Sequence, residues 1–243
     1  MESDQSKIPS TSSVYEEILR IERCLSESFE RDVSVELDLV DRAVVLLTTA
    51  LSSVEPVNTA RADEIAMPRS GGVRNIMLFA LQGIGALALH VIRAARASLA
   101  AGYEVESLGN DRILVEFTAH RKALLEDTTG KEARAWLEAE TRKGIGKRVS
   151  KVAPEGLFSF LSQFAHADAR PLGHMANYDA RTLRLAPVRT GITNTSLVLH
   201  AMFATDQAAM IATLAGFELP GHLDLMNAIV ARRNELLRDE ELT

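Results

Sequence analysis

The sequence predicts an all-α fold, a single-domain bundle of about eight helices. Aromatic residues make up only 5% of the 243 residues, which disfavours an all-β sandwich or barrel. Apolar residues recur at spacings of three and four over long segments, the period of a helix packed on one side. Many of the 14 Gly and 7 Pro gather between those segments. A chain of this length is expected to form one domain.

The N-terminal quarter is expected to hold a disordered start and two helices. Residues 1–12 are polar and Ser-rich, so the helical domain should cover 13–243. Residues 55–72 hold a cluster of Pro and Gly that predicts a loop. The two expected helices run from Ser12 or Ser13 to about Arg31, and from a cap at Asp32 or Ser34 to about Val54.

A third helix is expected from Val73 to about Ala101, because Gly102 is a good left-handed terminator. This segment is apolar on nearly all sides, which predicts a place at the centre of the bundle. Gly83 and Gly85 lower its helix propensity, so we expect a neighbouring helix to approach closely there.

The remaining helices are separated by Gly and Pro. Residues 170–193 should be irregular, with short extended pieces at Leu183, Leu185 and Val188. The expected helices are Glu106–Asp127, Lys131 to about Lys143, Pro154 to about Ala169, Thr195–Ala215 and Gly221–Arg238.

Charge and composition favour a soluble cytoplasmic protein. The net charge of −6 disfavours general binding to nucleic acid. The polar start does not resemble a secretory signal, and the near-apolar run 76–89 is shorter than the roughly 20 residues that span a bilayer. The single cysteine, Cys24, is expected to be a buried thiol within a helix. Arg outnumbers Lys 21 to 6, as is common in bacterial chains.

No motif for a nucleotide, a dinucleotide, a nucleophilic serine or a zinc site occurs. We therefore expect no metal and no cofactor, and we assign no firm catalytic residue. His90, His200 and His222 stand singly on expected helices, where satisfied or surface histidines are more common than ligands.

Arg112, Glu116 and His120 are spaced four apart and form one polar stripe along a helix. Such a stripe can be a semi-buried network in which Glu116 orients His120, which would suit proton transfer or ligand binding. It can equally be an ordinary ion-pair ladder, worth about 0.3–0.5 kcal/mol per pair. These three residues are candidates for a site.

A second polar set lies near the end of the helix expected at 154–169. Ser162 and His166 share a face there and are further catalytic candidates. The candidate ligand-binding residues Asp168, Arg170 and His174 follow. The spacing matches no established metal-ligand motif, and cationic side chains also suit a helix C-terminus for electrostatic reasons.

Four basic residues surround two glycines, a composition that can bind phosphate groups. They are equally typical of a basic helix C-terminus followed by a solvated loop, and no aromatic residue interleaves with them for base stacking. The candidate phosphate-binding residues are Arg142, Lys143, Lys147 and Arg148.

The segments AGYEVESLGNDRILVEF and LFSFLSQFAHAD resemble a broad set of uncharacterised bacterial all-helical proteins. Those proteins carry Arg-x-x-x-Glu on one helix and Ser-x-x-x-His on a later one, matched here by Arg112 with Glu116 and by Ser162 with His166. The resemblance covers about 75–170 and implies a bundle in which the two pairs can meet in the interior.

Some of these proteins are similar to the HEPN group of RNA-cleaving and defence domains, which place a histidine after an arginine and four to six further residues. None of the six histidines here has an arginine at that spacing. The sequence thus favours a non-catalytic interaction or regulatory module, which binds a protein partner or itself and which the resemblance links to bacterial stress or phage defence. The alternatives are a HEPN-like ribonuclease or other acid/base enzyme, and a small-ligand sensor.

Overall fold

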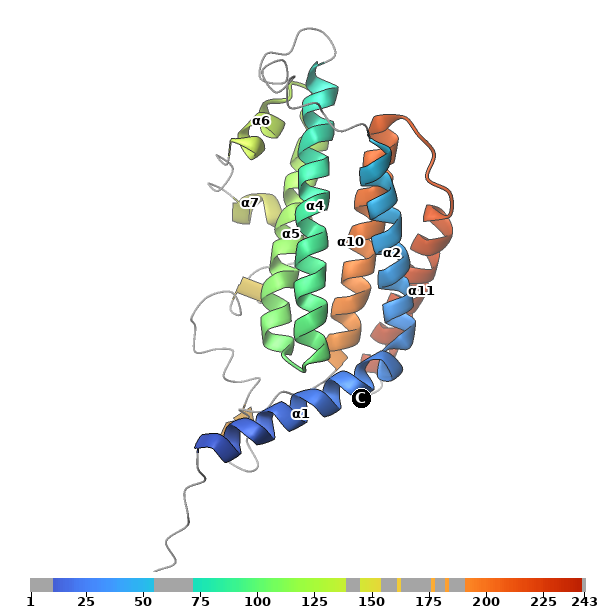
Figure 1. Ribbon diagram of the computed structural model, residues 1–243. Coiled ribbons are helices and arrows are strands. Elements are labelled where there is room, and N and C mark those ends of the chain that lie inside the picture. The colour runs from blue at the N-terminus through green and yellow to red at the C-terminus, as the bar shows by residue number, and fades with distance from the viewer. Residues whose placement is uncertain are drawn as a thin grey trace, which may run out of the picture.

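Five long helices run side by side along most of the molecule (Figure 1). The computed structural model describes residues 11–54, 72–138, 145–153, 161–162, 176–177, 182–183 and 191–241. The helices in these residues are α1 (Thr11–Asp32), α2 (Ser34–Ser53), α4 (Gly72–Ala100), α5 (Glu104–Glu126), α6 (Lys131–Leu137), α7 (Ile145–Val149), α10 (Gly191–Ala215) and α11 (His222–Glu241). The all-α bundle predicted from the sequence is confirmed.

The irregular segment predicted at 170–193 holds one small strand pair among the residues described there. β1 (Ala176–Asn177) pairs antiparallel with β2 (Thr182–Leu183), so that Ala176 lies opposite Leu183. The extended backbone predicted at Leu183 is therefore present. Leu185, Val188 and residues 1–10 of the expected disordered start lie outside the described residues.

α10 lies at the centre of the bundle, in contact with α2, α4, α5 and α11. Ala201, Ala204, Ala208 and Ile211 on α10 are completely buried. The prediction that the third helix would occupy the centre is wrong. In the most apolar 18-residue window of α4 only 39% is buried, against 61% in α10. Low polarity on all sides did not reveal that one side of α4 packs against none of the other described helices.

The two glycines of α4 mark close approaches, as the sequence predicted. A Cβ atom at Gly83 would lie 2.9 Å from the indole ring of Trp136 on α6. At Gly85 it would lie 3.3 Å from a methyl group of Leu51 and 3.4 Å from one of Ile211. α2, α6 and α10 therefore pack tightly against α4 at these positions.

Backbone geometry fixes several helix ends. Gly102 ends α4 with a φ of 84°, and the amide of Tyr103 donates to Ser98 O, which confirms the predicted left-handed terminator. The cap predicted at Asp32 or Ser34 is wrong. Val33 occupies that position and makes no side-chain cap, while its backbone continues the helical hydrogen bonds to Phe29 O and from Leu37 N.

α6 is shorter than expected, since it ends at Leu137 rather than near Lys143. The residues Ile145–Val149, predicted as part of a loop, form the short helix α7. Val149 packs with Leu108, Val115 and Ala119 of α5 in a second apolar cluster. α7 is thus attached to the side of α5 by an apolar contact.

α1 crosses the lower end of the bundle at an angle to the other long helices (Figure 1). Phe29, near its end, is buried in the core. The prediction that Cys24 would be buried is wrong, because its side chain is exposed. Glu22 and Ser26 on either side of it contact Tyr103 and Ala100 O, so Cys24 lies on a side of α1 that faces away from these contacts.

We predict that Gly85→Leu lowers the free energy of unfolding by about 1–3 kcal/mol, because the added side chain must fit between Leu51 and Ile211. Urea denaturation measures the change. Ala231→Leu on the exposed side of α11 is the control and should stay within about 0.5 kcal/mol of the parent. Equal stability of the two variants would contradict the close packing at Gly85.

Candidate functional site

A buried group of three polar side chains joins α5 to α10. Asp111 on α5 lies 2.6 Å from Nε2 of His200 on α10, measured from Oδ1. Ser196, one turn before His200, donates its hydroxyl to Oδ2 of Asp111 at 2.7 Å. His200 is 0% exposed, Ser196 3% and Asp111 4%. Each of these polar side chains therefore finds a partner in place of water.

These residue types are those of a hydrolytic triad, yet their arrangement differs from one. In a triad the carboxylate binds one ring nitrogen and the serine binds the other. Here Ser196 Oγ and Asp111 Oδ1 both face Nε2, at 3.4 and 2.6 Å, and the serine proton is directed to the carboxylate. His200 Nδ1 is buried and has no hydrogen-bond partner among the described residues. The group is suited to holding helices together rather than to nucleophilic attack.

Two neighbouring contacts extend this polar layer along α10. Glu104 at the start of α5 accepts hydrogen bonds from the backbone amide and the hydroxyl of Thr193. Ser107 Oγ lies 3.4 Å from Ser196 Oγ. α5 and α10 are thus joined by polar contacts over two successive turns.

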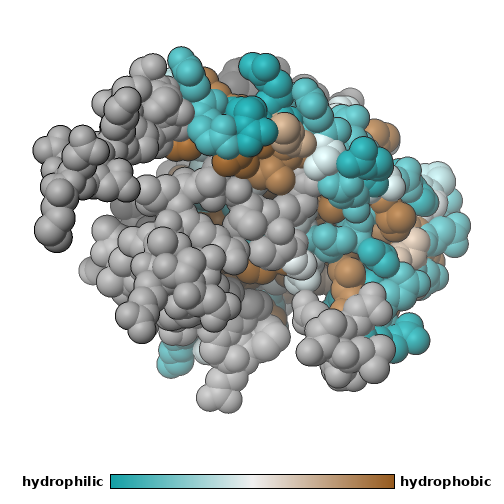
Figure 2. Space-filling model, turned by 90° about the horizontal axis from the view of Figure 1, so that it is seen from below, coloured by the Kyte–Doolittle hydropathy of each residue, from teal (hydrophilic) through white to brown (hydrophobic). Residues whose placement is uncertain are grey.

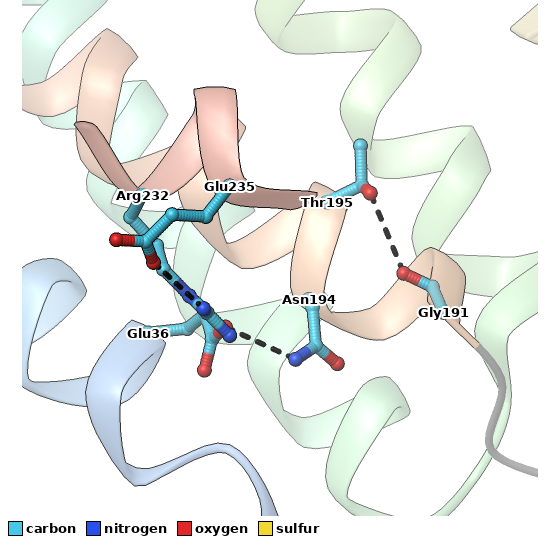
Figure 3. A network of polar contacts seen from close by, with 6 residues as sticks. All are labelled: Glu36, Gly191, Asn194, Thr195, Arg232 and Glu235. Carbon is cyan, nitrogen blue, oxygen red and sulfur yellow. Dashed lines mark hydrogen bonds and ion pairs between the residues drawn. The ribbon is translucent and has the colours of Figure 1, made fainter. Parts of the chain in front are cut away.

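A third polar contact ties α2, α10 and α11 together (Figure 3). Glu36 on α2 is almost completely buried and accepts from Arg232 of α11 at 2.6 Å. The side-chain amide of Asn194 donates to the same carboxylate oxygen at 3.0 Å. A buried carboxylate needs such partners, and here each comes from a different helix.

The stripe predicted from the sequence lies on another side of α5. Arg112 and Glu116 form an ion pair at 2.9 Å, with side chains 20% and 25% exposed. His120 is half-buried near α6 and α7, and its Nδ1 has no hydrogen-bond partner among the described residues. The predicted pairing of Arg112 with Glu116 is present, but the orientation of His120 by Glu116 is not seen.

The environment of His120 is set by burial and two charges. Burial lowers the pKa of His120 below 6.5, the nearby Arg148 lowers this pKa further, and Glu132 opposes that shift. Arg148 and Glu132 themselves form an ion pair at 2.8 Å between α7 and α6. His120 is thus held in its neutral form at pH 7.

Some of the other candidate residues predicted from the sequence lie within the described residues, and the rest lie outside them. Leu161 packs with Leu108 and Val115 of α5, which brings the start of the Ser-x-x-x-His segment against this helix, and Ser162 beside it is half-buried. Lys147 of the basic set is exposed, while Arg148 is bound to Glu132. The candidates outside the described residues are Arg142, Lys143, His166, Asp168, Arg170 and His174.

Sequence reasoning missed the group formed by Asp111, Ser196 and His200. The spacing of Ser196 and His200, one turn apart, was a weak signal, but no pattern linked them to Asp111. Within the described residues no cluster of three or more His, Cys, Asp or Glu side chains could hold a metal ion. No protein-family model, curated protein or solved structure matches the chain.

We predict that Asp111→Leu lowers the free energy of unfolding by about 3–5 kcal/mol, because it leaves His200 and Ser196 buried without their carboxylate. The double variant Asp111→Leu/His200→Leu removes both strongly polar groups and should be more stable than the single variant. Urea denaturation of these two variants and of His200→Leu tests this coupling. Simple addition of two separate losses would show that the pair is not coupled.

We predict that His120 titrates below pH 6.5 and that its two charged neighbours move its pKa in opposite directions. Arg148→Gln should raise this pKa, whereas Glu132→Gln should lower it. Since the unfolded chain binds a proton more readily, His120 also contributes stability above pH 6.5 that is lost as the pH falls. Titration of the imidazole NMR signals provides the measurement. A shift in the same direction in both variants would contradict this account.

Proposed function

We propose that this protein is a non-catalytic helical interaction module that pairs with a second copy of itself through the outer face of α4. The observation that carries the proposal is the exposure of an apolar helix surface. Leu87 is 48% exposed and Phe79 is 40% exposed. Ala86, Ala94 and Ala97 on the same face are also exposed. Burial of such a surface in a partner is favourable, which makes it a candidate interface.

The apolar character of α4 also fits a membrane helix by length and composition, and the same is true of α10. α4 is nevertheless fixed to the bundle along its inner side. Ile76 near one end and Leu99 near the other are completely buried, and the side-chain amide of Gln207 donates to Leu81 O at 2.7 Å. A partner that approaches only the outer side leaves these contacts intact, which favours a protein surface over the interior of a bilayer.

The shape of this face favours a second copy as the partner. Ala86 and Leu87 lie at the middle of α4. The large side chains lie on the N-terminal side of this midpoint, where Phe79 is exposed and Trp136 covers Gly83. The C-terminal side carries Ala94 and Ala97. Because Phe79 and Ala94 are equally far from the midpoint, an antiparallel pair places the large side chains of each copy over the small ones of the other, as two-fold symmetry requires.

The lower end of the molecule is less suited than the α4 face to be an apolar interface. Where its residues are described, that end is mainly hydrophilic, with hydrophobic side chains in small separate groups (Figure 2). The polar side chains exposed on the α4 face are Asn75, His90 and Arg93, a low charge density for a water-facing helix. Catalysis receives less support, since the Ser, His and Asp group is buried between helices.

We predict that the protein is a dimer at micromolar concentration and that Leu87→Glu weakens the dimer by at least about tenfold, because a charge would be buried at the two-fold axis. Light scattering after size exclusion measures the mass over a range of concentrations. Leu223→Glu on α11 is the matched control, since Leu223 is 66% exposed and should tolerate a charge.

Two outcomes would contradict this proposal. One is a parent protein that stays monomeric at all concentrations. The other is flotation of the parent with lipid vesicles that Leu87→Glu abolishes, which would assign the face to a membrane. Circular dichroism of both variants confirms that the helices remain folded.

A further inference from the structure

A cavity of about 330 Å³ lies on the other side of α5 from the polar stripe. It is partly open to solvent and is lined by α5, α10, the start of α11 and the residues that follow α7. Most of its wall is apolar and includes Val115, Leu199, Met202, Phe203 and Met226. The volume lies at the lower end of the range of about 300–1,000 Å³ typical of small-molecule sites.

Arg121 supplies the principal polar group of this cavity. Its side chain is almost fully buried, and its guanidinium lies 5.1 Å above the ring of Phe203. Nη2 donates to Asp206 Oδ2, and Nη1 makes a long contact of 3.5 Å with Gln207 Oε1. An arginine has five N–H donors, of which two have protein partners among the described residues. The cavity therefore contains a buried group with spare donor capacity.

The remaining polar groups of the wall limit what can bind. Thr118 donates its hydroxyl to Leu114 O on its own helix at 3.0 Å. The Asp206 side chain is 41% exposed and neutralises Arg121. A ligand carboxylate would meet the negative charge of Asp206, and a ligand cation would meet the positive charge of Arg121. An uncharged carbonyl group can accept from the guanidinium without either conflict.

We propose that this cavity binds an uncharged, largely apolar small molecule whose one amide or carbonyl group faces Arg121 and Asp206. The carbonyl oxygen accepts a hydrogen bond from Arg121, and an amide N–H can donate to the carboxylate beside it. The apolar part of the molecule packs against Met202, Phe203 and Met226. Burial lowers the pKa of Arg121 while Asp206 opposes that shift, as expected where a charged donor has lost water. This site is independent of the α4 face.

Three probes of nearly equal shape test the proposal: 4-cyclohexylbenzamide, 4-cyclohexylbenzoate and cyclohexylbenzene. The readout is NMR of the protein labelled with ¹³C at its methionine methyl groups, because Met202 and Met226 line the cavity. Met77, on α4 and outside the wall, is the internal control. We expect the benzamide to shift the Met202 and Met226 signals and to bind at least about tenfold more tightly than the other two probes.

Two variants separate the cavity from the polar contact. Ala153→Phe adds a ring to the cavity wall, keeps both residues of the ion pair and should abolish the shifts, whereas Ala231→Phe on the exposed side of α11 should leave them unchanged. Arg121→Met should remove the preference for the benzamide over cyclohexylbenzene. If Arg121→Met does not fold, Ala153→Phe still decides whether the cavity binds.

Three results would overturn the proposal. They are the absence of shifts at Met202 and Met226 with every probe, equal binding of the benzamide and the hydrocarbon, and tightest binding of the benzoate. The second would reduce the site to an apolar void, and the third would make it an anion site.

Discussion

The hydrogen-bonded pair of Asp111 and His200 is the contact on which the arrangement of this bundle depends. α10 is buried on almost every side, so its apolar residues do not specify which side faces which neighbour. A buried carboxylate does specify it, because Asp111 is stable in the interior only where His200 and Ser196 reach it. Together with the contacts of Glu104 with Thr193 and of Arg121 with Asp206, it sets the rotation of α10 relative to α5.

Much of the architecture follows from local sequence chemistry. Gly102 ended a helix where a left-handed residue was required, and Gly83 and Gly85 marked tight packing that the structure contains. These features were predictable because each depends on the backbone freedom of one residue. The N-terminus of α2 was not, because Val33 continues the helical hydrogen bonds without a polar cap and is held there by burial. Tertiary packing overrode the local preference for Asp32 or Ser34.

The candidate site was less accessible to prediction. Arg112 and Glu116 could be paired from sequence because they are one turn apart on one helix. Asp111 and His200 are 89 residues apart, and nothing in either segment identifies the other. The prediction that α4 lies at the centre of the bundle was wrong for a related reason. Its composition is that of a central helix, but the number of neighbours around a helix is a property of the whole fold.

The rotation of α5 about its axis determines which of its side chains face α10 and the cavity. Once Asp111 faces α10, helical spacing directs Thr118 and Arg121 toward α10 as well, where Arg121 meets Asp206 and Phe203 around the cavity. Arg112, the residue after Asp111, then lies on a different side of α5 and pairs with Glu116, while His120 lies near Glu132 of α6 and Arg148 of α7. A polar contact that adds little net stability can therefore be retained because it fixes which side chains line the cavity. An apolar pair at these two positions would pack as well, but the rotation of α5 would then depend on the remaining polar contacts, those of Glu104 with Thr193 and of Arg121 with Asp206.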